Sequence, residues 1–584
     1  MSETLTRDSA TITAAVGAGP DPVRAARPRR RVIDRSTVIV FGAVALVLAI
    51  IVVWPIAELL LTGASADGLA TIVGTFTHAV DRRALLNTLV LGLLTGVFGT
   101  LIGLCFAFAQ VRLAFRGRRL VHLIALLPVV APPFAIATAV IVQFGRKGLI
   151  SNGLFHTPLD VYGLPGLVLV MSLSFSPIAY LTIRGMLMNV DASMEEAAAN
   201  LGANRFRVFR TVTLPMIFPG IAGSFLFLFV EAISDLANPL IIGGDYSVLA
   251  SRVYFAINGD FSMTKAAAYS IVLLIPALLV FVLQHYWVGK RNVVSVTGKP
   301  SAKPTLITAP ALRIPVLTIV ALVSALIVLV FLTVIVGGFI DIIGVKNTFT
   351  LDHYRQILTG RAPGAFLDTA VLAVIAAPIS GLLGTLIAWL VVRKLGRRLG
   401  GVVDFIGMLG VAVPGIVLGL GYAIAFSVPY LVLGVKVPAL AGGNGIAGGA
   451  IAILLVYIVF SLPAGQRSSI AAISQIHPAI EEASTSLGAG SLRTFVTTTL
   501  PLLRPALIAG VSYAIARSMT ALTPIIFVTT PRTHIVSAQL LDEVDTGRFG
   551  NAFAYCTLLI AVVLGFMGLL NLALRRWGTV RTDG

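Results

Sequence analysis

The chain is a series of long apolar runs separated by short polar segments. Each of twelve runs is long enough to cross a membrane core of about 30 Å as a helix. Prolines and glycines inside several runs predict kinks in those helices. The pattern therefore predicts an all-α polytopic membrane protein with about twelve transmembrane helices. The runs span residues 37–61, 85–111, 121–144, 164–185, 216–240, 266–288, 313–340, 366–392, 403–434, 447–465, 502–528 and 549–574.

Polar stretches divide these runs into two six-helix units. Residues 1–36 are polar and rich in Ala, Pro and Arg, which predicts a disordered basic cytoplasmic tail. We interpret the first run as a retained anchor, because it has about the 20 residues needed to span a bilayer and no clear small-residue cleavage site. Lysines, arginines and prolines in 289–312 predict a cytoplasmic linker. The predicted units are a first transmembrane domain at 37–288, a second at 313–576 and a cytoplasmic C-terminal tail at 577–584.

One polar segment occurs in both halves, after the fourth run of each. Residues 195–215 read EEAAANLGANRFRVFRTVTLP and residues 481–501 read EEASTSLGAGSLRTFVTTTLP, which agree at 12 of 21 positions. The offset of 286 residues (481 − 195) is close to half of the 584-residue chain. The chain is therefore predicted to be an internal duplication.

Each copy of this segment predicts a short helix in a loop, at 190–215 and 476–501. Ser193 and Glu196 fit a capping box that would start the first helix, and Gly202 would end it. In the second copy Pro478 suits the first helical position and Gly488 marks the end. A second, amphipathic turn is predicted beyond each glycine.

Both copies share the pattern Glu-Ala-x4-Gly-x11-Leu-Pro, which resembles the E-A-A loop of ABC-importer permeases. In that family the loop is a cytoplasmic coupling helix that docks on the ATPase subunit. Ser484 departs from the family's preferred alanine but is small enough for docking. The resemblance implies two ABC ATPase subunits, which bind ATP and Mg, and an extracytoplasmic solute-binding protein. It assigns ATPase coupling to Glu196, Ala197, Gly202, Pro215, Glu482, Ala483, Gly488 and Pro501.

The alternative for Glu196 and Glu482 is that they only cap and solvate a surface helix. Two copies in register favour coupling over this alternative.

Composition and charge support a membrane location. The chain is 57% hydrophobic and only 12% charged, and its mean hydropathy is +0.96, whereas soluble domains carry about 25% charged residues. The net charge of +18 does not indicate nucleic acid, because the basic residues flank apolar runs as the positive-inside rule requires. Cys105 and Cys556 lie inside apolar runs and are interpreted as packing residues.

Orientation follows from the same basic residues. An even number of spans places both termini on one side, and the arginines after the second and eighth runs fall on the side of the basic tail and of both repeated loops. We expect a bacterial plasma (inner) membrane protein with both termini cytoplasmic.

Charged residues inside the predicted membrane are the candidates for a translocation path. Six spans return the chain to its starting side, so the halves are expected to be related by a pseudo-twofold axis along the membrane normal. Glu231 and Asp235 are four residues apart in the fifth run, which would place them on one helix face. Position 231 + 286 is Arg517, so Glu231 and Arg517 could pair across the axis. The alternative is that either residue simply reaches water at the membrane surface.

Catalytic and cofactor motifs are missing from the sequence. It contains no G-x-x-x-x-G-K-[ST] phosphate loop. The seven histidines are scattered and form no metal-ligand spacing. We therefore expect a non-catalytic transport subunit without its own cofactor or metal site, whose ATP is hydrolysed by a partner.

The fused arrangement and the segments 238–244 and 546–550 look most like the ferric-iron permeases. This resemblance implies import of ferric iron delivered by the binding protein. Alternatives are import of aminoethylphosphonate, thiamine or polyamine by the same machinery. A secondary transporter, in which Glu231 and Asp235 carry protons, and a non-transporting scaffold are the candidates of another class.

Overall fold

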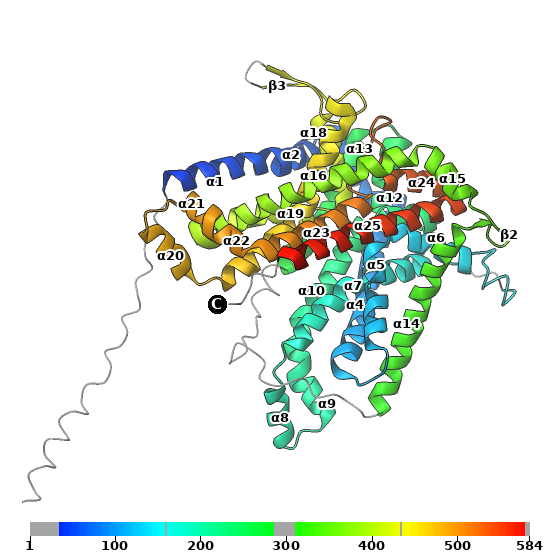
Figure 1. Ribbon diagram of the computed structural model, residues 1–584. Helices are drawn as coiled ribbons and strands as arrows, with labels where there is room; N and C mark the ends of the chain where they lie inside the picture. Colours follow the sequence, from blue (N-terminus) through cyan, green and yellow to red (C-terminus); the bar gives the residue numbers. More distant parts are fainter. Residues whose placement is uncertain (1–33, 158–159, 285–309, 433–434, 578–584) are drawn as a thin grey trace, which may run out of the picture.

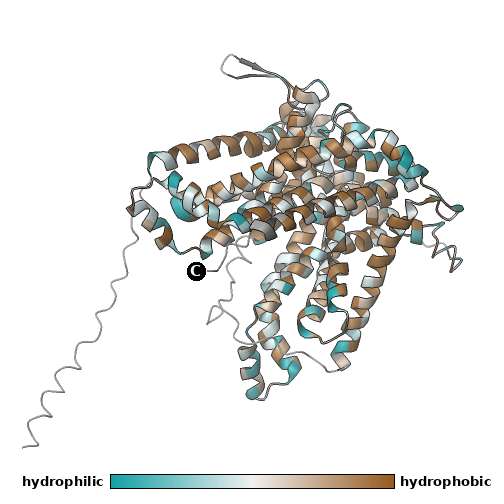
Figure 2. Ribbon diagram, viewed as in Figure 1, coloured by the Kyte–Doolittle hydropathy of each residue, from teal (hydrophilic) through white to brown (hydrophobic). Residues whose placement is uncertain are grey.

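The computed structural model describes residues 34–157, 160–284, 310–432 and 435–577. The predicted tails and linker lie outside these residues except at their borders. The described chain is almost entirely helical (Figure 1). Figure 2 shows long, mainly hydrophobic helices with hydrophilic residues gathered toward their ends, for example around α8, α9, α15 and α24.

By length and composition, nine helices of the described residues could cross a membrane, or up to twelve if each bent pair is one span. The bent pairs fall at 118–144, 397–426 and 491–520. The first two overlap most of the predicted runs 121–144 and 403–434, whereas the third begins in the predicted loop 476–501 and overlaps the run 502–528 only up to Thr520. Pro414 lies at the bend of the second pair, which measures 103°. The prediction of an all-α polytopic fold with about twelve spans is confirmed.

The first half contains α1 to α13. Its elements are α1 (Arg35–Leu48), the π-helical turn η1 (Ala49–Val53), α2 (Trp54–Gly63), α3 (Ala66–Thr77), α4 (Ala79–Arg112), α5 (Arg118–Val130), α6 (Pro133–Phe144), α7 (Leu164–Met188), α8 (Ala192–Asn200), α9 (Arg205–Val208), η2 (Phe209–Thr213), α10 (Leu214–Ser234), α11 (Ala237–Ile242), α12 (Leu249–Asn258) and α13 (Met263–Leu283).

The second half repeats most of this order, with two short antiparallel hairpins added and with turns at 523–528 in place of a helix equivalent to α11. Its elements are α14 (Pro310–Gly337), β1 (Ile340–Ile342), β2 (Lys346–Phe349), α15 (Asp352–Thr359), α16 (Ala362–Trp389), η4 (Leu390–Lys394), α17 (Arg397–Ala412), α18 (Gly415–Phe426), β3 (Tyr430–Val432), β4 (Val435–Val437), η5 (Ile446–Gly449), α19 (Ala450–Gln475), α20 (Pro478–Ser486), α21 (Ser491–Thr494), η6 (Phe495–Thr499), α22 (Leu500–Leu502), α23 (Arg504–Thr520), α24 (Val536–Asp545) and α25 (Phe549–Trp577).

Hydrogen bonds identify equivalent positions in the two halves. The amide of Leu249 at the start of α12 donates to Thr88 Oγ1 over 2.8 Å. The amide of Val536 at the start of α24 donates to Thr369 Oγ1 over 3.0 Å. The offset is therefore 281 residues between α4 and α16 (369 − 88) and 287 residues between α12 and α24 (536 − 249). The duplication inferred from the repeated loop extends over these helices.

Close packing of the long helices depends on glycines at equivalent positions. A Cβ atom at Gly103 in α4 would lie 2.5 Å from Cβ of Ala179 in α7. A Cβ atom at Gly384 in α16 would lie 2.6 Å from the backbone nitrogen of Gln466 in α19. Small residues allow such close approach of membrane helices. These contacts hold the spans to which the repeated loops are attached.

The first span of each half packs against the other half. α1, η1 and α2 contact α16, α17, α18 and α21 of the second half, and α14 contacts α4, α5 and α6 of the first. The hydroxyl of Tyr422 in α18 donates to the carbonyl of Ile51 in η1. In Figure 1 the blue α1 and α2 accordingly lie along yellow and orange helices of the second half. The division into two domains therefore holds in sequence order, while the packing interlocks the halves.

Candidate functional site

The first repeated loop folds as a short helix between two long spans. Its helix α8 begins after Asp191, whose side chain accepts a hydrogen bond of 3.1 Å from the amide of Ser193. The predicted capping box of Ser193 and Glu196 is therefore wrong, because Asp191 holds the capping position and Ser193 lies inside the helix. Gly202 follows the helix with a left-handed φ of +84°, as predicted.

The second loop forms the corresponding helix, α20. Pro478 is its first residue, as predicted, and the His477 side chain accepts a hydrogen bond of 3.2 Å from the amide of Ala479. Gly488 has a left-handed φ of +86°. Pro215 and Pro501 each stand at the second position of a following helix, α10 and α22. The two loops thus have the same backbone plan.

A buried glutamate fixes the first loop to the end of the second span. Both Glu195 carboxylate oxygens accept hydrogen bonds from the guanidinium of Arg112, at 2.6 and 2.7 Å. Thr213 at the far end of the loop donates to the same carboxylate over 2.5 Å. Glu195 is only 9% exposed. A bidentate pair with a third hydrogen bond gives both strength and a fixed orientation.

The second loop repeats this arrangement. Glu481 Oε1 lies 3.4 Å from Arg393 Nε and accepts a hydrogen bond of 3.0 Å from Thr499. Arg393 also donates to the carbonyls of Ile473 and Ile476 at the end of α19. Arg393 is equivalent to Arg112 at the offset of α4 and α16 (393 − 112 = 281). Each loop is therefore held by an arginine at the C-terminal end of a long span of its own half, which is α4 for the first loop and α16 with η4 for the second.

The anchors Glu195 and Glu481 are not among the residues predicted from the sequence, which are the second glutamate of each copy. The available signal was a Glu-Glu pair in both copies, together with an arginine at the end of the second and eighth runs.

The second glutamates lie on the outer face of each loop. Glu196 and Ala197 in α8, and Glu482 and Ala483 in α20, are exposed. Leu201 and Leu487, the residues that follow these helices, are each 89% exposed. An apolar side chain so exposed at the same place in two loops is typical of a protein interface. Ser484 instead bonds within its loop, because its hydroxyl lies 3.1 Å from that of Thr494.

The loops differ beyond their glycines. The first carries a capping Asn204, whose side chain accepts a hydrogen bond of 2.8 Å from the amide of Arg207. The second has Gly490 at this position, and the carboxylate of Asp34 in the first half accepts a hydrogen bond of 3.1 Å from the amide of Ser491 instead. Burial raises the pKa of Asp34, but hydrogen bonds from Thr37 and Ser491 outweigh this effect and hold the pKa below its usual range.

The helical segments that follow the loops, which we call the arms, also differ. Residues Arg205–Ser234 form one candidate span, whereas Ser491–Leu502 and Arg504–Thr520 are bent by 74°. Proline occurs at the same place in both arms, at Pro219 and Pro505, so proline alone does not account for the bend.

The structure brings Glu231 and Arg517 together across the two halves. Arg517 Nη2 lies 3.4 Å from Glu231 Oε1, and Nη1 donates to the Tyr513 hydroxyl over 3.0 Å. The Arg517 guanidinium also lies 4.1 Å from the ring centre of Phe460, a distance suited to a cation–π contact.

Asp235 lies directly beyond the helix that carries Glu231. α10 ends at Ser234, and Asp235 has an extended backbone with ψ of 132°. Its carboxylate accepts a hydrogen bond of 2.6 Å from the Asn238 side chain at the start of α11. The fifth run is therefore interrupted at Asp235, where the sequence predicted a continuous helix.

The sequence matches the family described as "Binding-protein-dependent transport system inner membrane component" twice, over residues 99–292 and 380–577. It is 32% identical to the "Ferric transport system permease protein FbpB" of Actinobacillus pleuropneumoniae over 497 residues, which are 83% of this chain and 70% of that protein. It is also 32% identical to the "Putative ferric transport system permease protein FbpB 1" of Haemophilus influenzae over 476 residues, 80% of this chain and 73% of that protein.

The "Molybdenum transport system permease protein ModB" of Escherichia coli is 30% identical over 213 residues, 34% of this chain and 91% of ModB. That relative corresponds to only one half of the duplication. Together with the two matched segments and the two relatives that cover most of the chain, this shows that the protein belongs to the binding-protein-dependent transport system inner membrane components, as a permease that carries the family's membrane domain twice.

Proposed function

We propose that this chain is the permease of an ATP-driven importer that carries ferric iron into the cytoplasm of a bacterium. Two ABC ATPase subunits, which hold ATP and Mg, would dock on α8 and α20, and an extracytoplasmic solute-binding protein would deliver the iron. Both termini would lie in the cytoplasm, on the side of the coupling loops. The observation that carries the proposal is the pair of equivalent loops, each exposed on one face and anchored on the other.

The anchored loops offer a mechanical route from the ATPase to the membrane. A force on the exposed face of α8 would reach α4 through the buried contact of Glu195 with Arg112. It would also reach α10, because Thr213, the residue directly before α10, donates a hydrogen bond to the same carboxylate. The second loop offers the equivalent route through Glu481 and Arg393. ATP-driven closure of the two ATPases would thus draw both arms together and reorient the path.

The path is proposed to run between the halves, past Glu231 and Arg517. These residues come from equivalent positions of the two halves and lie 3.4 Å apart. Because the path must open for transport, this contact is one that the two arms would have to break as they move. The contact between Glu231 and Arg517 would therefore favour the state in which the path is closed at these two residues.

Ferric iron is proposed as the substrate from the relatives that cover most of the chain, which are described as ferric transport permeases. The molybdenum permease matches only about a third of the chain. In the described residues, no group of three or more His, Cys, Asp or Glu side chains could hold a metal ion. The substrate assignment therefore depends on the relatives.

The experiment that tests coupling is co-purification of the chain with the ABC ATPase of its own organism. Leu201→Asp combined with Leu487→Asp, and Glu196→Arg combined with Glu482→Arg, are expected to release the ATPase. Both double variants alter only exposed side chains, so the chain itself is expected to remain folded. Asp67→Arg, at an exposed position of α3, is the control that should retain the ATPase.

Uptake of radioactive ferric iron in proteoliposomes then tests the substrate. Uptake that needs internal ATP and the binding protein supports the proposal. Uptake driven by a proton gradient without the ATPase would move the secondary transporter to first place. ATP-dependent transport of aminoethylphosphonate, thiamine or polyamine in place of iron would leave the machinery intact and correct only the substrate.

A further inference from the structure

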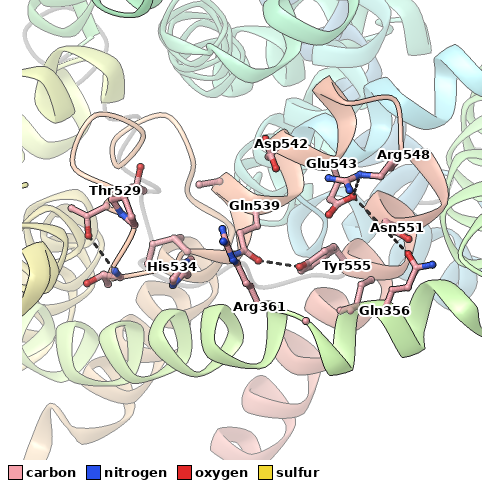
Figure 3. A pocket seen from close by; sticks show the side chains of 17 residues that line it. Gln356, Arg361, Thr529, His534, Gln539, Asp542, Glu543, Arg548, Asn551 and Tyr555 are labelled. Atoms are coloured by element: carbon pink, nitrogen blue, oxygen red, sulfur yellow. Dashed lines mark hydrogen bonds and ion pairs between the residues drawn. The ribbon is translucent and has the colours of Figure 1, made fainter. Parts of the chain in front are cut away.

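A cavity of about 630 Å³ lies at the end of the second half that faces away from the coupling loop (Figure 3). It is lined by α15, by the residue that precedes α16, by the segment 529–535, and by α24 and α25. Arg361 precedes Ala362, and the same helical span ends at Lys394, next to the second coupling loop. The cavity and the coupling loop thus lie at opposite ends of one span. Its volume is within the range of small-molecule sites, about 300–1,000 Å³.

The equivalent place in the first half is occupied by an ionic network. Asp81 Oδ1 accepts hydrogen bonds from Arg252 Nε over 3.0 Å and from the Tyr269 hydroxyl over 3.1 Å. The Arg252 guanidinium lies 5.8 Å from the centre of the Tyr269 ring. These three side chains come from α4, α12 and α13, and they join the three helices at that end of the half.

The second half keeps only the tyrosine of this network. The offsets of 281, 287 and 286 residues place Ala362, Gln539 and Tyr555 at the positions of Asp81, Arg252 and Tyr269. The third offset follows from the starts of α13 and α25 at Met263 and Phe549. Tyr555 now donates to Gln539 Oε1 over 3.0 Å. The aspartate and the arginine are both replaced, so the ion pair of the first half has no counterpart at these positions.

Most unpartnered side-chain groups of the lining are hydrogen-bond donors. The Gln539 carbonyl oxygen is used by Tyr555, and Glu543 is used by Arg548 and Asn551. Within the described residues, the Arg361 guanidinium and the amide nitrogens of Gln539 and Gln356 have no partner. In Figure 3, Arg361 and Gln539 project toward the middle of the cavity.

Two further ionisable side chains line the cavity, and donors still outnumber acceptors when these are included. His534 can donate or accept, according to its tautomer. Asp542 is the one lining carboxylate without a partner among the described residues. It is exposed, as are Arg361 and Gln356, and in Figure 3 it stands above the other labelled side chains, apart from Arg361. Apart from Asp542 and His534, the unpartnered side-chain groups of the described lining are therefore donors, and one of them, Arg361, carries a positive charge.

We propose that this cavity binds a small solute through a carboxylate or phosphate group. Arg361 is the charged anchor, because a guanidinium matches the geometry of two oxygens of such a group. The amide nitrogens of Gln539 and Gln356 supply further hydrogen bonds. The position of this site on the extracytoplasmic side rests on the proposed function, but its binding chemistry does not.

Isothermal titration of the purified full-length chain with sodium phosphate and with citrate tests the site. Saturable binding of at least one probe is expected, and Arg361→Gln should weaken it on the order of tenfold or more, since a charge-assisted hydrogen bond is lost. The matched control is Arg355→Gln, because Arg355 is an exposed arginine of α15 that does not line the cavity. This control should bind like the wild type.

A second variant uses the first half as a template. Ala362→Asp combined with Gln539→Arg should rebuild the network of Asp81, Arg252 and Tyr269 around Tyr555 and abolish binding of both probes. If this variant fails to fold, the comparison of Arg361→Gln with Arg355→Gln still decides.

Equal affinity of the wild type and Arg361→Gln would overturn the proposal. The proposal would also be overturned if the wild type bound neither probe. This holds even if Arg361→Gln weakened docking of the solute-binding protein, because the group that Arg361 binds would then be a side chain of that protein and not a small solute. The titration needs neither ATPase nor iron, so its failure is distinguishable from failure of the proposed importer.

Discussion

Asp34 caps a helix that lies 457 residues away in the sequence: its Oδ2 accepts a hydrogen bond from the amide of Ser491. Its other oxygen, Oδ1, accepts hydrogen bonds from Thr37 and Ser36 at the start of α1. One carboxylate thus binds both the first span of the first half and the repeated loop of the second half. Gly490 cannot cap this helix, because it has no side chain.

Asp34→Ala is expected to loosen the second coupling loop and leave the first unchanged. Loss of an N-cap costs about 0.5–2 kcal/mol, so hydrogen exchange should accelerate at 491–499 and the coupling of ATP hydrolysis to transport should weaken. The folded pKa of Asp34 is depressed, so its contribution is present above the ordinary aspartate pKa of about 3.9 and is lost as the pH falls toward the folded pKa. The contact should therefore be complete at neutral pH.

Gly490→Asn should rescue the second loop of Asp34→Ala. Gly490 has φ −67° and ψ 161°, close to the −70° and 163° of Asn204, and no heavy atom lies within 4 Å of its added Cβ. The new side chain can cap Arg493 as Asn204 caps Arg207. Exchange protection of the loop should return while α1 stays frayed. Rescue that fails although the variant is folded would show that Asp34 acts in another way.

Glu195→Ala should destabilise the chain far more than Glu196→Ala. Removal of one partner of a buried ion pair costs about 3–5 kcal/mol, and the side chains of Arg112 and Glu195 are 4% and 11% exposed. Glu196 is exposed, and its removal should change the unfolding free energy by about 0.5 kcal/mol or less. Thermal unfolding in detergent measures the difference. In ATPase co-purification, the folded fraction of Glu195→Ala should retain more ATPase than Glu196→Ala does. Equal unfolding temperatures would contradict an anchoring role for Glu195.

Exchange of the charges of Glu231 and Arg517 tests their contact. Glu231→Arg should abolish transport, because two like charges then meet inside the membrane, where an uncompensated charge costs about 2.5–3.5 kcal/mol. Adding Arg517→Glu should restore part of the transport rate. Arg504→Glu, at an exposed position near the start of the same helix, should have no such effect on Glu231→Arg. Transport that stays absent in a folded double variant would count against a functional pair.

Gly103→Val should separate α4 from α7. Its Cβ would lie 2.5 Å from Cβ of Ala179 and 2.7 Å from the backbone nitrogen of Tyr180, and such overpacking typically costs about 1–3 kcal/mol. Gly185→Ala in α7 is the matched control, since nothing lies within 4 Å of its Cβ. A lower unfolding temperature for Gly103→Val alone is expected. An unchanged temperature would show that the helices can move apart without cost.

The sequence was sufficient for the spans, the duplication and the exposed side of the loops, because each depends on a local pattern of apolar residues, glycines and prolines. Both helix ends at Gly202 and Gly488 follow from the left-handed φ that glycine permits. The anchors at Glu195 and Glu481 could not be assigned, since they depend on an arginine more than 80 residues away.

The end of α10 could not be predicted for a similar reason. The apolar run continues beyond Asp235, and only the hydrogen bonds of Asp235 with Asn238 show that the helix has stopped. The packing of α1 and α14 against the opposite halves was likewise invisible, because it joins segments with no common sequence pattern.

The bend of 74° after Leu502 gives the two arms different mechanics. The arm from Arg205 to Ser234 is one continuous helical segment, so a displacement of α8 would be passed on to Glu231 without a break in the helix. The arm from Ser491 to Thr520 has an elbow, so part of a displacement of α20 would be spent on flexing before it reached Arg517. In the importer proposed above, equal strokes of two identical ATPases would then produce unequal movements on the two sides of the path, a bias that a pore built from two identical chains could not contain.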